Sequence, residues 1–229
     1  MNSSQTQPFT EERGGVSVRG FLHLPAEPNG DALVLTHGAG ANCKSPLLTA
    51  LGNAFAASEL TVLRCDLPFR QLRPHGPPLR GSADRDQQGL HAAIASLRDR
   101  VAGRIFLGGH SYGGRMASML AASDPTLASA LLLLSYPLHP PKRREQLRTA
   151  HFRDLRTPAL FVSGTRDEFG LTEEIRTALR LITGRTEMLT IQGAGHQLLT
   201  SSNREELPGT VVRSFLEFLQ KSLAEPALR

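Results

Sequence analysis

A serine, an aspartate and a histidine occur along the chain in an order that could support nucleophilic catalysis. The serine is Ser111, in the segment GGHSYGG. A serine hydroxyl is a poor nucleophile near neutral pH, so it needs a histidine to take its proton and a carboxylate to orient that histidine. Asp167, in SGTRDEFG, and His196, in GAGHQ, follow the serine later in the chain. These three are the candidate catalytic residues if the fold brings them together.

The segment around Ser111 has the spacing G-x-S-x-G, from Gly109 to Gly113. In this motif a sharp turn between a strand and a helix exposes the serine hydroxyl, and glycines are needed because neighbouring chain packs closely on both sides. The apolar run RIFL precedes the motif, and a helical pattern follows it. The alternative is a glycine-rich turn in which the serine only caps the helix. The flanking strand and helix favour the nucleophile.

Other acids and histidines fit these roles less well. Glu168 adjoins the candidate aspartate and would point elsewhere, while Asp66 precedes the serine. His110 lies inside the motif, and we expect its side chain to be directed away. His37 follows the first central strand, where its usual role would be to tie down a loop. The remaining histidines outside the candidate site precede the last predicted strand: His23, His75, His91, His139 and His151.

Two backbone N–H groups are candidates for stabilising the oxyanion of an acyl-transfer reaction. The N–H of Tyr112 begins the helix after Ser111. The second donor should come from the glycine-rich loop after the first central strand, and we assign it to Ala39, with Gly40 as the alternative. We also expect His37 and Gly40 to contact the substrate.

Short β-rich runs alternate with helical patterns, which predicts an α/β fold: a three-layer α/β/α sandwich with a mostly parallel central sheet. We expect one domain over residues 1–229, with a flexible tail over 1–15 and a loop over 68–81. Ser82 is a plausible N-cap for the helix that follows this loop. The predicted strands are one or two over 16–25, then 32–37, 61–68, 104–109, 129–136, 157–164 and 186–192, and the predicted helices are 45–60, 82–101, 111–124, 171–183 and 211–224.

Ser111, Asp167 and His196 each follow a predicted strand. The carboxyl ends of parallel strands meet at one edge of a sheet, where ligands of open α/β sheets bind. The three candidate catalytic residues are therefore expected at the same edge.

Composition excludes several other classes of protein. The 229 residues carry a net charge of +5, but no basic run is interleaved with aromatic residues, so we expect no nucleic-acid partner. The longest apolar run, LASALLLL, is too short to span a bilayer, and the N-terminus has no secretory pattern, so we expect a cytoplasmic protein without a membrane partner. Cys43 and Cys65 are expected to be buried free thiols, with one disulfide as the alternative.

The segments HGAGAN, GGHSYGG, SGTRDEFG and GAGH, in this order, resemble the α/β-hydrolase superfamily from about Phe21 onward. DLPFRQLRPHGPP and LLLLSYPLHPP further resemble a branch related to dienelactone hydrolases, which also contains testis-expressed and histone-acetyltransferase-complex-subunit relatives. The resemblance implies a three-layer fold with a Ser-Asp-His triad. Dienelactone hydrolases proper have a cysteine nucleophile where this chain has Ser111, so their substrate is not carried over.

These observations lead us to expect a serine hydrolase that cleaves a small ester, or less readily a thioester or amide, without a metal or cofactor. The connection from Tyr136 to Ala159 is too short for a helical cap, which predicts an open, shallow cleft. The alternatives are a non-catalytic scaffold or binding subunit and an acyltransferase or perhydrolase. We expect a monomer or homodimer.

Two basic segments follow strands and should border the cleft. They suggest an anionic ester as the substrate, bound by steering or by a direct arginine clamp, with Arg70 and Arg73 as candidate substrate-binding residues. The alternative is a solvated basic face. The basic residues are Arg64, Arg70, Arg73 and Arg80 in the first segment, and Lys142, Arg143, Arg144, Arg148, Arg153 and Arg156 in the second.

Overall fold

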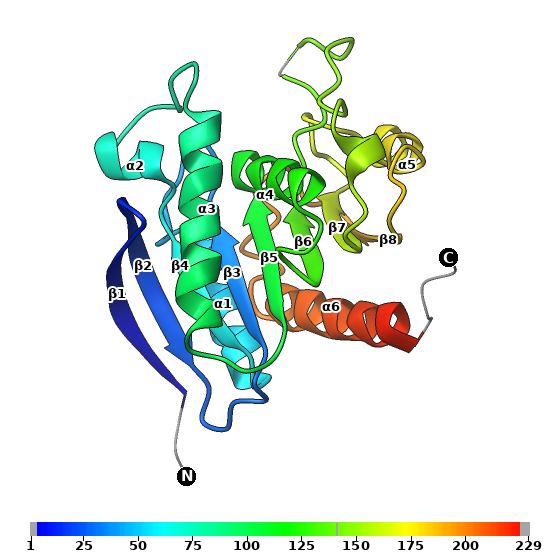
Figure 1. Ribbon diagram of the computed structural model, residues 1–229. Helices are drawn as coiled ribbons and strands as arrows, with labels where there is room; N and C mark the ends of the chain where they lie inside the picture. The colour runs from blue at the N-terminus through cyan, green and yellow to red at the C-terminus, as the bar shows by residue number, and fades with distance from the viewer. Residues whose placement is uncertain (1–3, 141, 225–229) are drawn as a thin grey trace.

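The computed structural model describes residues 4–140 and 142–224, which form an eight-stranded sheet covered by helices on both faces (Figure 1). The strand order is β1-β2-β4-β3-β5-β6-β7-β8, and all neighbours from β4 to β8 are parallel. The strands are β1 (Gln5–Arg13), β2 (Val16–Leu24), β3 (Ala32–Thr36), β4 (Thr61–Cys65), β5 (Ile105–His110), β6 (Ala130–Leu134), β7 (Ala159–Gly164) and β8 (Thr186–Ile191). The helices are α1 (Pro46–Ala57), α2 (Pro68–Leu72), α3 (Ala83–Arg98), α4 (Tyr112–Ser123), the 3₁₀ helix η1 (Phe152–Asp154), α5 (Thr172–Leu179) and α6 (Glu206–Ala224).

Alternating side chains of the central strands form two hydrophobic cores, one on each face of the sheet. In β3, Val34 packs into the core shared with α3 and α4, whereas Leu33 and Leu35 pack into the core shared with α1 and α6. Figure 1 shows α3 and α4 in front of the sheet and α1 behind it. The predicted three-layer α/β/α architecture is therefore confirmed.

The first strand lies where a flexible tail was expected, so that expectation is wrong for residues 5–13. β1 pairs with β2 along its whole length in antiparallel register, from Gln5 opposite Leu24 to Arg13 opposite Val16. Phe9 is the buried residue of β1 in the described structure. An edge strand held by backbone hydrogen bonds needs little apolar sequence, which is why the pattern did not reveal it.

The proline-rich segment after β4 also differs from the expectation of a loop. It begins with the short helix α2, which has Pro68 at its first turn. Proline is tolerated there because the first N–H groups of a helix have no intrahelical acceptor. Ser82 occupies the N-cap position of α3, but its side chain makes no capping hydrogen bond.

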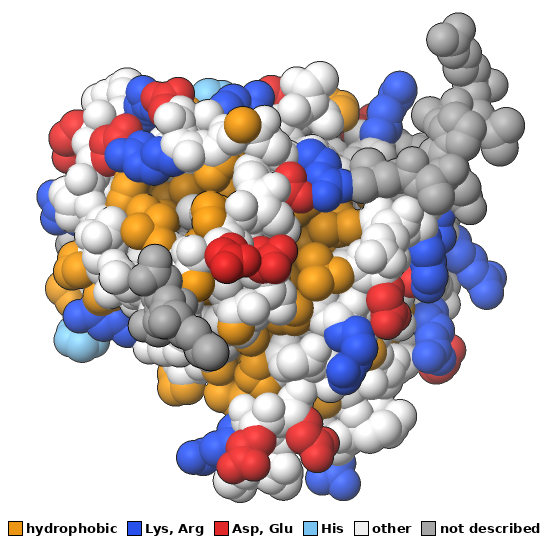
Figure 2. Space-filling view, turned by 90° about the horizontal axis from the view of Figure 1, so that it is seen from below, with side chains coloured by type: hydrophobic (Ala, Val, Ile, Leu, Met, Phe, Trp, Pro, Cys, Tyr) orange, Lys and Arg blue, Asp and Glu red, His pale blue; other side chains and the backbone are white. Residues whose placement is uncertain are grey.

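The amino ends of the central strands lie at the lower edge of the sheet as drawn in Figure 1. Figure 2 shows this lower face, where basic and acidic side chains are interspersed and hydrophobic side chains are visible between them. Within the described part of the chain, none of the helices combines the length and apolar character that crossing a bilayer requires. Cys43 and Cys65 are both buried and free, as expected.

Candidate active site

Ser111 lies at a strained turn between β5 and α4. Its backbone has φ 51° and ψ −117°, a conformation that typically costs a non-glycine residue about 1–3 kcal/mol. The Ser111 N–H donates to Leu134 O at 2.8 Å, and the Ser111 carbonyl accepts from the Arg115 N–H at 3.0 Å. The Ser111 side chain makes no capping hydrogen bond to α4. The hydroxyl is thus available for contacts outside the helix.

The glycines on either side of Ser111 allow this turn. A Cβ atom on Gly113 would lie 2.5 Å from the carbonyl oxygen of His37, and one on Gly109 would lie 2.6 Å from the carbonyl carbon of Gly113. Both distances are too short for any side chain, and in each case the nearest atom belongs to the backbone. The close packing expected from the G-x-S-x-G spacing is present.

Ser111, His196 and Asp167 form a continuous chain of hydrogen bonds. His196 Nε2 lies 2.8 Å from Ser111 Oγ, and His196 Nδ1 lies 2.9 Å from each carboxylate oxygen of Asp167. Because a carboxylate only accepts, Nδ1 carries the hydrogen and Nε2 is free to accept the serine proton. The structure therefore brings together the three residues that follow β5, β7 and β8, in an arrangement able to activate the serine hydroxyl.

Two further residues position His196. The ring of Phe169 stacks on the imidazole of His196 with centroids 4.1 Å apart, and the Phe169 N–H donates to Asp167 Oδ1 at 2.9 Å. His110 Nε2 donates to the backbone carbonyl of His196 at 2.8 Å, so its side chain is directed toward the His196 loop rather than away from the site. Burial lowers the pKa of His110 to about 4, which keeps it neutral near pH 7. Sequence reasoning missed both contacts.

Hydrogen bonds fix the backbone of the loop after β3 around Ala39. The Gly38 carbonyl accepts from the Ala41 N–H at 3.1 Å and from His37 Nδ1 at 2.9 Å. In a trans peptide the next N–H points opposite to the carbonyl, so these bonds also orient the Ala39 N–H. Ala39 borders the same cleft as Ser111 and Tyr112. The Tyr112 N–H has no acceptor within α4, because Tyr112 is the first residue of that helix.

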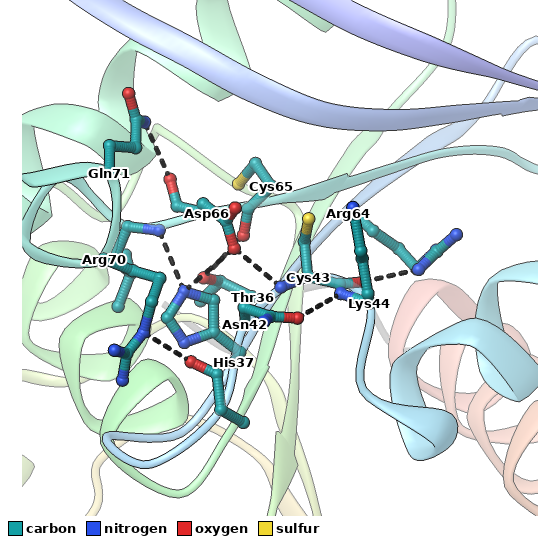
Figure 3. Close-up of polar contacts among 12 residues, drawn as sticks. Thr36, His37, Asn42, Cys43, Lys44, Arg64, Cys65, Asp66, Arg70 and Gln71 are labelled. Atoms are coloured by element: carbon teal, nitrogen blue, oxygen red, sulfur yellow. Dashed lines mark hydrogen bonds and ion pairs between the residues drawn. The ribbon is translucent and has the colours of Figure 1, made fainter. Parts of the chain in front are cut away.

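His37 makes hydrogen bonds that hold this loop, and its ring lies close to Asp66 and Arg70 (Figure 3). Its Nδ1 donates to Gly38 O, and its Nε2 accepts from the Leu67 N–H at 3.1 Å. Burial lowers the pKa of His37 and keeps the ring neutral. The neighbouring Asp66 carboxylate accepts from the Cys43 N–H at 2.7 Å. The His37 side chain is fully buried and holds the loop, so the expected substrate contact is corrected.

Arg70 is also used within the protein. Its guanidinium donates to four backbone carbonyl groups, and it is 6% exposed. Figure 3 shows this side chain beside His37. Because its donors are engaged in holding the loop, Arg70 does not have the substrate-binding role expected from the sequence. The four acceptors are Ala39, Ala41, Arg73 and Gly76, at 2.7 to 3.0 Å.

An open cleft of about 470 Å³ lies beside Ser111. Three arginines border it: Arg80, Arg115 and Arg148. Gly40 and Arg73 are not among the described residues that line the cleft, so neither is placed to make the substrate contact expected from the sequence. The described part of the connection from β6 to β7 contains one short helix, η1, and no cap covers the cleft.

A model of the alpha/beta hydrolase domain matches residues 29–220, and the chain belongs to this family. The dienelactone hydrolase of Anabaena variabilis is similar in fold, with a TM-score of 0.75 at 19% identity over 94% of this chain and 99% of that chain. A serine hydrolase without lid from Xanthomonas campestris gives a TM-score of 0.67 at 15% identity over 93% of this chain and 95% of that one. Est1E from Butyrivibrio proteoclasticus, with ferulic acid bound, gives 0.70 at 17% identity over 93% of this chain and 99% of that one.

These structural neighbours confirm the α/β-hydrolase fold and include a dienelactone hydrolase, as the sequence resemblance indicated. At identities below 25% they establish the fold alone. The resemblance to testis-expressed and acetyltransferase-complex relatives stays a prediction.

Proposed function

We propose that this protein is a serine hydrolase that cleaves small carboxylic esters through an acyl-enzyme. The observation that carries the proposal is the unbroken hydrogen-bond chain from Asp167 through His196 to Ser111. Ser111 is the nucleophile, His196 the general base and then the general acid, and Asp167 holds the imidazole in its working tautomer.

In the first half of the proposed reaction, Ser111 Oγ attacks the ester carbonyl carbon and its proton passes to His196 Nε2. The carbonyl oxygen becomes an oxyanion, which the N–H groups of Ala39 and Tyr112 stabilise. Collapse of this intermediate breaks the ester C–O bond, and the departing alcohol takes the proton from His196. In the second half, water attacks the acyl carbon and gives a proton to His196. The bond from the acyl carbon to Ser111 Oγ then breaks, Oγ takes the proton back from His196, and a carboxylic acid is released.

The shape of the cleft favours a small ester as the substrate, because the cleft is open to solvent. The absence of a cap over the described cleft lets an ester reach Ser111 without a lid motion. The similarity to a serine hydrolase without lid, and to an Est1E structure that holds ferulic acid, agrees with this substrate size. Thioesters and small amides are the next candidates, because they react through the same tetrahedral chemistry.

Acyl transfer or perhydrolysis is the rival within enzymology, since an open cleft also admits nucleophiles other than water. Product analysis with added alcohol or hydrogen peroxide separates these reactions from hydrolysis. A non-catalytic scaffold is the rival of another class. The strained backbone of Ser111 argues against it, because a scaffold gains nothing from that conformation.

Hydrolysis of p-nitrophenyl acetate tests the proposal directly. We expect Ser111→Ala to lower kcat by about 10³-fold or more, as is typical when a triad nucleophile is removed. Ser82→Ala is the matched control, because Ser82 borders the same cleft and its side chain does not cap α3. Equal loss in both variants, or full activity of Ser111→Ala, would contradict the proposal.

A further inference from the structure

Two of the three arginines that border the cleft beside Ser111, Arg115 and Arg148, come from different segments. Arg115 lies one turn into α4, where its N–H donates to the Ser111 carbonyl at 3.0 Å. Arg148 lies in the connection between β6 and β7. Both side chains are half-buried. The helix that carries the proposed nucleophile and the loop across from it therefore each contribute a guanidinium to the same cleft.

The Arg115 guanidinium is incompletely satisfied by the protein. Its Nε is buried and has no hydrogen-bond partner among the described residues. Buried N–H donors are paired in the great majority of native structures, and an unpaired one is costly. The Arg115 side chain, which also borders the cleft, thus has no acceptor for this N–H in the described part of the protein.

The positive charge of the pair is also not offset by an acid. The ion pairs of the described residues involve other arginines, such as Arg13, Arg104 and Arg176, and no carboxylate in the described chain lies within 4.0 Å of Arg115 or Arg148. Burial, and secondly the charge of Arg115, lowers the pKa of Arg148.

His151, on the same side of α4, does not add a negative or positive charge. Its Nε2 lies 2.8 Å from Ser118 Oγ. Burial, and secondly the charge of Arg115, lowers the pKa of His151 to about 4 and keeps it neutral near pH 7. Among the described residues, Arg115 and Arg148 are thus two like charges without a direct ion-pair partner.

Arg148 is held in place by its backbone, which leaves most of its guanidinium free. Its N–H donates to the Leu138 carbonyl at 2.8 Å, and its carbonyl accepts from the Tyr136 hydroxyl at 2.6 Å. One side-chain nitrogen, Nη1, reaches the Pro137 carbonyl at 3.4 Å, which is a weak contact. The remaining N–H groups are available to a ligand without a rearrangement of the backbone.

We propose that Arg115 and Arg148 form an anion subsite that binds a free carboxylate carried by the ester substrate. This inference rests on the proposed esterase function and specifies its substrate class: esters that bear a second, ionised carboxyl group. A planar guanidinium matches the two oxygens of a carboxylate, and a bound carboxylate would offset the two charges. The residues differ from Arg70 and Arg73, which the sequence had suggested.

A pair of matched esters tests the subsite. The probes are 4-acetoxybenzoate, which carries a carboxylate, and its neutral methyl ester, with each enzymatic rate divided by the rate in hydroxide. We expect the wild-type protein to prefer the anionic ester by about tenfold or more in kcat/KM, as charge-assisted hydrogen bonds typically provide. Arg148→Gln and Arg115→Gln should each reduce this preference by about the same factor. The kcat/KM for the neutral ester should stay within about twofold of wild type.

Arg143→Gln is the matched control, because Arg143 is exposed in the same basic segment and lies outside the cleft lining. It should keep the preference. If Arg143→Gln loses as much of the preference for the anionic ester as Arg148→Gln, or if the wild type shows no preference, the subsite is contradicted while the esterase proposal stands. If Arg115→Gln does not fold, Arg148→Gln alone decides.

Binding separates this inference from the esterase proposal. If neither ester is hydrolysed, the esterase proposal fails, and calorimetric titration of the wild-type protein with both probes then tests the subsite. Binding of 4-acetoxybenzoate about tenfold tighter than the methyl ester, lost in Arg148→Gln, supports it. Equal binding of the two probes overturns it.

Discussion

His110 Nε2 donates a 2.8 Å hydrogen bond to the backbone carbonyl of His196. The residue directly before the proposed nucleophile thus holds the loop that carries the proposed base. The centroids of the His110 and His196 rings are also 5.2 Å apart. Small misplacements of a catalytic group can cost about 10²-fold in rate, so this contact gives His110 a positioning role.

We predict that His110→Ala lowers kcat by about 10- to 100-fold with little change in KM, because His196 loses a constraint while the cleft is unchanged. Steady-state kinetics with p-nitrophenyl acetate measure both constants. His91→Ala, at an exposed position on α3, is the control and should behave as wild type. A loss confined to KM would contradict a positioning role.

Arg70 and Arg73 should respond differently to the same substitution. Arg70→Gln removes a guanidinium that holds the carbonyls of Ala39 and Ala41, so we expect kcat to fall by about tenfold or more as the oxyanion donor loosens. Arg73→Gln removes one weak contact of 3.4 Å to Pro77 and should leave kcat within about twofold. The reverse order would contradict the structural role of Arg70.

Gly113→Ala and Gly209→Ala should change stability in opposite directions. At Gly113 a Cβ atom would lie 2.5 Å from a backbone oxygen, so the free energy of unfolding should fall by about 1–3 kcal/mol or more. At Gly209, within α6, nothing lies within 4 Å of an added Cβ, and alanine should stabilise the helix by up to about 1 kcal/mol. Urea denaturation measures both. Equal stability of the two variants would argue against close packing at the turn.

Three histidines, of which His23 and His110 are buried and His151 is half-buried, predict a loss of stability in acid. Burial lowers the pKa values of His23, His110 and His151 from 6.5 to about 4. Between these values the unfolded chain binds more protons than the folded one. Their contribution to stability is therefore complete above pH 6.5 and is lost as the pH falls toward 4.

Urea denaturation at pH 7.5 and pH 5 measures this loss, which approaches about 1.4 kcal/mol per pH unit for each fully linked histidine. His23→Gln should make the loss smaller than in wild type. The side-chain oxygen of the glutamine can still accept from Arg64 Nε, which lies 2.6 Å from His23 Nε2 in the wild-type protein. His75→Gln, at an exposed position, should leave the loss unchanged. Identical pH dependence in all three proteins would refute the linkage.

The fold and the three candidate catalytic positions could be predicted because their signals are local. Ser111 is marked by glycines at fixed spacing, and Asp167 and His196 lie in the loops that follow β7 and β8. The order of the elements then places all three at the carboxyl edge of the sheet.

The supporting contacts could not be predicted because they join segments far apart in the chain. The sequence shows the charge of Arg70 but not that its guanidinium reaches back to the 39–41 loop. Likewise, the sequence places Arg115 in a helix but does not show that its side chain borders the cleft. β1 was missed because its alternation contains a single buried apolar residue, Phe9.

The most direct measurement of the central claim is covalent labelling of the purified protein with a fluorophosphonate probe, followed by mass spectrometry of the labelled peptide. Such probes react with serines whose hydroxyl is activated by a neighbouring base. The hydrogen-bond chain from Asp167 to Ser111 predicts a single label on Ser111 that both Ser111→Ala and His196→Ala abolish. A folded protein that takes no label at Ser111, or one that His196→Ala labels as fast as wild type, would contradict an activated nucleophile.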